Sequence, residues 1–185
     1  MIYLIGGSSS VGKTTMARSL SKYYDMFCLH LDDFTKGFND PELEFFTGKA
    51  DFWDQAAQEL FERLVRVTEK TEPYLHSFVS EWVAGGKSGI IEGEKIHPRF
   101  MEKVVSSNSA KGIFLIETDR EQLYQTLQQR SLRFRELSGT QQWKVAEVNQ
   151  RYGLWLKQEA KRRNLIWENA QPWETLVSRV LDRFQ

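Results

Sequence analysis

The chain has 185 residues, of which 41% are hydrophobic and 27% charged, as is ordinary for one globular domain and unlike a disordered chain. Its 25 Lys and Arg residues balance its 25 Asp and Glu residues, so no overall field attracts nucleic acid or an anionic membrane, and we expect neither as a partner. No apolar run approaches the ~20 residues that span a bilayer, and the single cysteine, Cys28, fits a reducing cytosol, so we expect a cytoplasmic protein.

Five short, nearly continuous apolar runs predict buried strands. Continuous runs, unlike strictly alternating ones, are typical of a parallel sheet that is covered on both faces. The predicted strands are Ile2–Ile5, Phe27–Leu31, Gly89–Ile91, Gly112–Ile116 and Leu165–Trp167.

Segments of helical period lie between these runs. An apolar stripe spaced by three or four residues predicts a helix over Asp51–Thr68, and Pro73 is well placed to open another. Strand–helix alternation of this kind predicts a three-layer α/β/α sandwich around a five-stranded parallel sheet, formed by one domain over residues 1–185. Ligands of such sheets bind beyond the carboxyl ends of the strands. Further helices are predicted at Arg120–Ser131 (capped by Asp119), Gln141–Arg163 and Trp173–Phe184.

The first predicted strand runs into a loop with the pattern Gly7-x-x-x-x-Gly12-Lys13-Thr14, which fits a phosphate-binding loop (P-loop). Backbone N–H groups of such a loop, together with the N-terminus of the next helix, form a nest for phosphate. Lys13 is expected to reach the β- and γ-phosphates, and the Thr14 hydroxyl to ligate Mg²⁺. The loop therefore predicts binding of a nucleoside triphosphate. The expected nucleotide-binding residues are Gly7, Ser8, Ser9, Ser10, Val11, Gly12, Lys13, Thr14 and Thr15.

Three uses of the nucleotide are open: phosphoryl transfer, timed hydrolysis and motion. The Asn-Lys-x-Asp tetrapeptide of guanine-specific GTPases does not occur in the sequence, which favours ATP. The second predicted strand ends in "LHLDDF", placing Asp32 and Asp33 near the P-loop edge. A kinase needs a carboxylate there to orient the acceptor hydroxyl and take its proton. We interpret Asp32 as this base, with Asp33 assisting at magnesium or substrate; the alternative is a helix cap or a solvated pair at the end of a strand.

These residues resemble the P-loop small-molecule kinases. The segments "GGSSSVGKTT", "LDDF", "IIEGEKIHPRF" and "ETDREQLYQTLQQRSLRFRE" occur in the order of that family. Uridine kinase and nicotinamide riboside kinase are similar in carrying Asp-x-Phe after the second strand. The segments "GGSSSVGKTT" and "IIEG" also resemble 2-phosphoglycerate kinase and its relatives. The resemblance covers essentially the whole chain and implies that Asp32 matches the aspartate that activates the acceptor.

The resemblance also implies roles for later residues. Glu92 matches a carboxylate that holds Mg²⁺ through water, although it can also cap the next helix. Arg130 and Arg133, three apart on one predicted helical face, match arginines of a mobile lid at about residues 130–140 that close on the phosphoryl group. In that family an aspartate often follows, whereas Glu136 stands here.

Residues for the acceptor are expected from three places. Asp51 and Trp53 lie where nucleoside kinases present residues to the acceptor, and Arg99 follows the third strand. The loop Thr35–Gly48 is rich in aromatic residues and is expected to close over a ligand. Asn169–Gln171 occupies the position where adenine is commonly held.

The sequence thus predicts an ATP- and Mg²⁺-dependent kinase for a small-molecule hydroxyl, with a nucleoside-like acceptor favoured. The alternatives are a 2-phosphoglycerate-type or antibiotic-modifying phosphotransferase and a regulatory nucleotide-binding protein. Oligomeric state cannot be read from the sequence.

Overall fold

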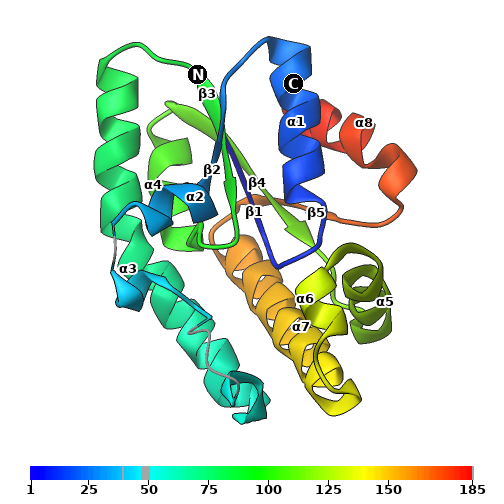
Figure 1. The fold of residues 1–185 in the computed structure, drawn as a ribbon. Coiled ribbons are helices and arrows are strands. Elements are labelled where there is room, and N and C mark those ends of the chain that lie inside the picture. Colours follow the sequence, from blue (N-terminus) through cyan, green and yellow to red (C-terminus); the bar gives the residue numbers. More distant parts are fainter. Residues whose placement is uncertain (39, 47–50, 185) are drawn as a thin grey trace.

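The computed structural model of the chain describes residues 1–38, 40–46 and 51–184. Five parallel strands form one sheet in the order β2-β3-β1-β4-β5 (Figure 1). The three-layer sandwich with a five-stranded parallel sheet is therefore confirmed. The strands are β1 (Ile2–Gly7), β2 (Cys28–His30), β3 (Gly89–Gly93), β4 (Ala110–Ile116) and β5 (Ile166–Asn169).

Helices cover both faces of the sheet, as Figure 1 shows. On the central strand β1, Ile2 and Leu4 pack into a core cluster with residues of α3, α4 and α7, whereas Tyr3 and Ile5 pack into a second cluster with residues of α1, α5 and α8. This alternation follows from the two-residue period of a strand, and burial on both faces explains the continuous apolar runs. In the part of the chain that the structure describes, no helix is both long and apolar enough to cross a membrane. The helices are α1 (Lys13–Tyr24), α2 (Leu31–Lys36), α3 (Ala57–Ala84), α4 (Pro98–Ser106), α5 (Arg120–Arg130), α6 (Leu132–Arg135), α7 (Gly139–Arg162) and α8 (Trp173–Phe184), with 3₁₀ turns η1 (Pro41–Leu43) and η2 (Phe52–Asp54).

The prediction of two helices around Pro73 is wrong, because α3 runs through this proline. Buried residues recur every four positions on both sides of it, at Val67, Thr71, Leu75 and Val79. Proline removes one backbone hydrogen bond and strains the preceding turn. The continuous packed stripe outweighs that cost. The predicted start at residue 51 is also wrong, since residues 52–54 form the separate turn η2.

The second strand is shorter than predicted, and its acidic pair has a different setting. Leu31 already belongs to α2, so Asp32 and Asp33 occupy the first turn of a short helix and do not extend the strand. Acidic side chains in a first helical turn are stabilised by the helix dipole. Part of the segment expected to be a closing loop is thus α2 and η1. Residues 39, 47 and 48 of that loop lie outside the described residues.

The expectation that Arg130 and Arg133 share one helical face is also wrong. Helix α5 ends at Arg130, and Ser131 follows in extended backbone with φ −114° and ψ 111°. The Ser131 hydroxyl then accepts the Phe134 N–H and caps α6. The two arginines therefore belong to different helices.

Candidate nucleotide and acceptor site

The P-loop joins β1 to α1 through three residues with positive φ. These are Gly7 (146°), Ser10 (61°) and Gly12 (89°). A Cβ atom on Gly12 would stand only 2.4 Å from Cζ3 of Trp173, so only glycine fits under that ring. The loop thus has the backbone turns that the sequence pattern predicts, directly before the N-terminus of α1.

Side chains of the P-loop contact the end of the neighbouring strand. The Lys13 ammonium donates to the Ser8 carbonyl at 2.7 Å, so it lies folded over its own loop. The Thr14 hydroxyl donates to Glu92 Oε1 at 2.9 Å, which brings the two expected magnesium residues together. His30 Nδ1 lies 2.6 Å from the same Glu92 oxygen. His30 was not singled out by the sequence, although it ends β2 at the register position paired with Glu92.

The side chains of Thr14 and Glu92 are of a kind that can hold Mg²⁺ beside a phosphate. Mg²⁺ is usually held by one or two carboxylates together with water and phosphate oxygens. Thr14 and Glu92 supply one hydroxyl and one largely buried carboxylate beside the phosphate loop, and His30 fixes the orientation of that carboxylate. Among the described residues, no group of three or more His, Cys, Asp or Glu side chains is placed to hold a metal ion. The residues therefore fit a metal shared with a bound triphosphate.

Helix α7 holds the P-loop from the other side. The backbone N–H of Ser9 donates to Asn149 Oδ1 at 2.9 Å, and Asn149 Nδ2 donates to the Val145 carbonyl at 2.9 Å. Asn149 is buried. It was missed by the sequence analysis because it lies 140 residues from its partner, on a helix predicted only as charged. Asn149 fixes the loop backbone and reaches the cavity described next.

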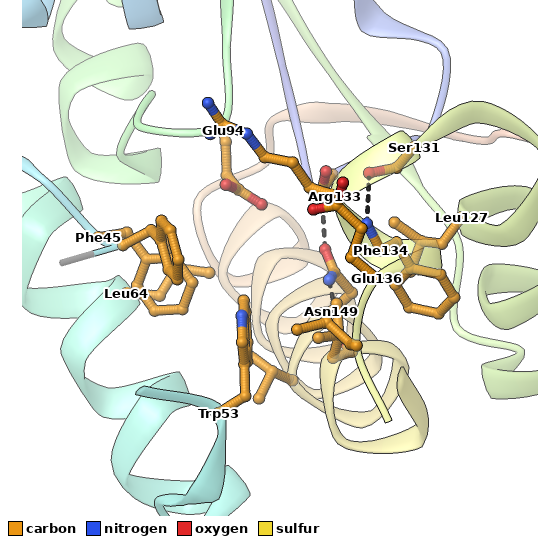
Figure 2. A pocket seen from close by; sticks show the side chains of 15 residues that line it. Phe45, Trp53, Leu64, Glu94, Leu127, Ser131, Arg133, Phe134, Glu136 and Asn149 are labelled. Carbon is orange, nitrogen blue, oxygen red and sulfur yellow. Dashed lines mark hydrogen bonds between the residues drawn. The ribbon is translucent and has the colours of Figure 1, made fainter. Parts of the chain in front are cut away.

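A cavity of about 430 Å³ opens beside the P-loop and α7. Figure 2 shows Phe45, Leu64 and Trp53 on one side of it and Leu127, Ser131 and Phe134 on the other. Glu94, Arg133 and Glu136 are its charged lining residues. Because Ser9 also lines it, the cavity is continuous with the nucleotide loop. Its lining residues are Ser9, Phe45, Phe46, Trp53, Leu64, Glu94, Leu127, Ser131, Arg133, Phe134, Glu136, Leu137, Val145, Val148 and Asn149.

Glu94 and Lys95 directly follow β3, and Glu94 lines the cavity. Burial raises the pKa of the Glu94 carboxyl; the Lys13 ammonium opposes this shift, and the Asp32 carboxylate adds to it. Lys95 is almost completely buried, and its ammonium donates to the Thr35 hydroxyl at 2.8 Å. Burial lowers the pKa of Lys95, while Asp32 and Glu94 favour its charged form. Asp32 therefore lies within electrostatic reach of Glu94 and Lys95.

Asp32 and Asp33 lie in different surroundings. Asp32 is exposed at the start of α2, near Glu94 and Lys95, but it does not line the cavity. Asp33 is exposed and pairs with Lys36 at 3.1 Å on the surface of α2. Of the two, Asp32 is therefore the residue that lies near Glu94, which lines the cavity.

The two lid arginines occupy different places. Arg133 lines the cavity, and in Figure 2 it extends from α6 over the pocket. Arg130 does not line it; its guanidinium lies over the ring of Trp173, 4.9 Å from the centroid. Since Trp173 lies against Gly12, Arg130 is placed beside the P-loop and not at the cavity. The segment Asn169–Gln171 leads from β5 into this Trp173 contact.

Two residues expected at the acceptor are not brought to the cavity. Arg99 donates through Nε to Glu72 Oε2 at 2.8 Å, a contact between α4 and α3. Asp51 is exposed ahead of η2, whereas Trp53 of the same turn does line the cavity. Arg99 is engaged by Glu72 because that buried carboxylate needs a partner.

Comparisons with known proteins bear on the fold. The chain matches no protein-family model and no curated protein in sequence. Among solved structures, the deoxyadenosine kinase of M. mycoides with bound dATP is similar with a TM-score of 0.55 and 14% identity, covering 100% of this chain and 99% of that one. A gluconokinase of Sinorhizobium meliloti 1021 is similar with a TM-score of 0.55 and 10% identity, covering 100% and 94%. The chain has the fold of these P-loop kinases.

Proposed function

We propose that the chain is an ATP-dependent kinase that transfers the γ-phosphoryl group to a hydroxyl of a small molecule. The observation that carries this proposal is the continuity of the two sites: Ser9 belongs to the P-loop and lines the 430 Å³ cavity. An acceptor in that cavity would lie beside the triphosphate tail. A protein that only hydrolyses ATP needs room for a water molecule, not a cavity of this size next to the loop.

The reaction follows from the residues around the loop. The P-loop amides and Lys13 bind the β- and γ-phosphates, and positioning by such groups is the main source of catalysis in phosphoryl transfer. The acceptor oxygen attacks the γ-phosphorus, its bond to phosphorus forms as the β–γ bridging bond breaks, and ADP leaves. The acceptor proton passes to the carboxylate of Asp32 and then to solvent. Asp32 is expected to act as base because it lies within electrostatic reach of Glu94, which lines the cavity.

Charge on the transferring group is balanced by cations. Arg133 extends over the cavity and is expected to contact the phosphoryl group, with Arg130 acting from beside the P-loop, where it lies over Trp173. Thr14 and Glu92 would hold Mg²⁺, which supplies neutralisation of the phosphate oxygens when bound. His30 keeps the Glu92 carboxylate turned toward Thr14.

A nucleoside-like acceptor is favoured by the aromatic residues of the cavity. Phe46 and Trp53 have nearly parallel rings, with an interplanar angle of 19°, and such faces suit a planar ring. The similar deoxyadenosine kinase was also solved with the product dCMP. The structure offers no comparable reason for an antibiotic or for 2-phosphoglycerate.

The test is transfer of labelled phosphate from ATP to a panel of nucleosides, sugars and phosphorylated acids, with product mass as readout. Lys13→Ala should abolish turnover. Asp32→Asn should lose transfer by a factor of about 10² or more while it still binds nucleotide. Glu62→Gln, an exposed change on α3, is the matched control.

Two results would contradict the proposal. ATP consumption with no phosphorylated product across the panel would favour a regulatory nucleotide-binding protein. Undiminished transfer by Asp32→Asn would remove Asp32 as the base, and Glu94→Gln would then be the variant to compare.

A further inference from the structure

The charges that line the cavity do not suit an anionic acceptor. Among the described residues that line it, Glu94 and Glu136 are acidic and Arg133 is the basic residue. Arg133 sits in α6, in the position from which it would contact the phosphoryl group. With a triphosphate bound and Arg133 on the phosphoryl group, the charged groups left to meet the acceptor are the two carboxyls, beside the apolar side chains and the uncharged polar residues Ser9, Ser131 and Asn149.

The buried lysine beside the cavity is already engaged. The Lys95 ammonium donates to the Thr35 hydroxyl, and the charges of Asp32, Glu94 and Glu44 favour its charged form against the opposing charge of Lys36. Acidic side chains of the protein therefore already stabilise this ammonium group. An acceptor carboxylate or phosphate would have to compete with three acidic side chains for one ammonium group.

The cavity has an aromatic wall formed by Phe45, Phe46 and Trp53. Two arginines of the helices around the cavity are already bonded to protein atoms. Arg63 donates through Nε to the Phe45 carbonyl at 2.9 Å and through Nη2 to the Glu44 carbonyl at 3.1 Å. Arg151 pairs with Glu147 at 2.8 Å along α7. Both guanidinium groups thus bind protein atoms, and Arg133 is the basic residue among the described residues that line the cavity.

The carboxyl of Glu94 points to the same conclusion. Burial already raises its pKa, which means that negative charge is costly at that position. A second anion beside it would add to that cost. Carboxyl oxygens accept hydrogen bonds whether or not the group is ionised, so N–H and O–H groups suit both Glu94 and Glu136.

We propose that the acceptor is a ring compound that bears N–H or O–H donors and carries no negative charge. This inference rests on the proposed kinase function and narrows its substrate class. The rings of Phe45, Phe46 and Trp53 contact one face of the compound, and the carboxyls of Glu94 and Glu136 accept its donors. Acids such as gluconate and 2-phosphoglycerate are thereby excluded as acceptors.

The test measures binding without turnover, so that it stands apart from the test of the kinase reaction. Dissociation constants are determined by calorimetry or ligand-observed NMR, with Mg²⁺ and a non-hydrolysable ATP analogue present. The neutral probes are adenosine, cytidine and uridine; the anionic probes are orotidine, gluconate and 2-phosphoglycerate. Uridine and orotidine form a matched pair that differs by one carboxylate.

We expect at least one neutral nucleoside to bind at least tenfold more tightly than every anionic probe, and uridine to bind more tightly than orotidine. Glu136→Gln, an exposed substitution that leaves the core untouched, should reduce the preference for uridine over orotidine by severalfold. Glu94→Gln should reduce it further, and Glu62→Gln should leave it unchanged.

Tightest binding by an anionic probe would overturn the inference, as would the absence of binding by all three nucleosides. An unchanged preference in both glutamate variants would also overturn it. If the preference is found but no compound of the panel is phosphorylated, the charge selectivity of the cavity stands and the proposed kinase reaction is contradicted.

Discussion

His97 provides a quantitative test of how α4 is held against the rest of the fold. The side chain is 5% exposed, packs against Trp155 with ring centroids 5.6 Å apart, and accepts the Arg99 N–H through Nδ1 at 3.0 Å. Burial lowers the pKa of His97 from 6.5 to about 4; Glu72, 3.9 Å away, opposes this shift and Arg99 reinforces it.

The sign of the effect follows from proton linkage. The unfolded chain binds this proton more readily than the folded chain, so acid favours unfolding. The contribution to stability is complete above pH 6.5 and is lost as the pH falls toward 4. A difference of about 2.5 pH units at about 1.4 kcal/mol each predicts a loss of about 3 kcal/mol.

The assay is urea unfolding of the wild type and of His97→Asn at several pH values between 4 and 7. Asparagine also accepts the N-cap hydrogen bond but does not titrate in this range. The variant should be less stable at pH 7, and the gap between the two curves should close by about 3 kcal/mol at pH 4. Glu72 is present in both proteins: burial raises its pKa but is outweighed by the hydrogen bonds from Arg99 and Lys103, which lower it, so its acid titration affects both curves. Parallel curves would refute the reasoning.

Three further predictions concern the P-loop. Gly12→Ala places a Cβ against Trp173 at a positive φ; it should cost about 1–3 kcal/mol in a thermal melt and abolish ATP binding in a nucleotide titration. Asn149→Leu leaves the Ser9 amide without its acceptor. The free energy of unfolding should fall by about 1–3 kcal/mol, and ATP affinity should fall with it. Asn149→Asp keeps an acceptor oxygen and should therefore retain part of the ATP affinity that Asn149→Leu loses. ATP affinity is measured with Mg²⁺ and with EDTA, and Mg²⁺ should raise it in the wild type. Glu92→Gln should reduce this Mg²⁺-dependent gain by about tenfold or more. A gain equal to that of the wild type would contradict the metal assignment.

The strands were predictable because burial on both faces leaves a continuous apolar signal in each. The P-loop was predictable because the signature and its strand–helix context are local. The predicted ends of helices and strands were wrong where tertiary packing sets them. Pro73 stays inside α3 because buried residues continue beyond it, and Leu31 starts a helix although it extends an apolar run.

The site residues that were missed depend on contacts across the fold. His30 and Glu92 are 62 residues apart and meet only because β2 lies next to β3. A histidine that ends one strand, beside a glutamate that ends its neighbour, was a signal in the sequence, but it has meaning only once the strand order is known. Arg99 was assigned to the acceptor from its position after a strand, and the buried Glu72 that engages it lies in a different helix.

The way the aromatic wall is fastened has a practical consequence. Arg63 donates hydrogen bonds to the backbone carbonyl oxygens of Glu44 and Phe45, and Lys144 of α7 donates to the carbonyl oxygen of Asp54 at 3.1 Å. Every amino acid has such an oxygen, so these attachments do not depend on which side chains the wall displays. If the proposed kinase function holds, libraries randomised at positions 45, 46 and 53 can therefore be screened for new acceptors while the P-loop is left as it is.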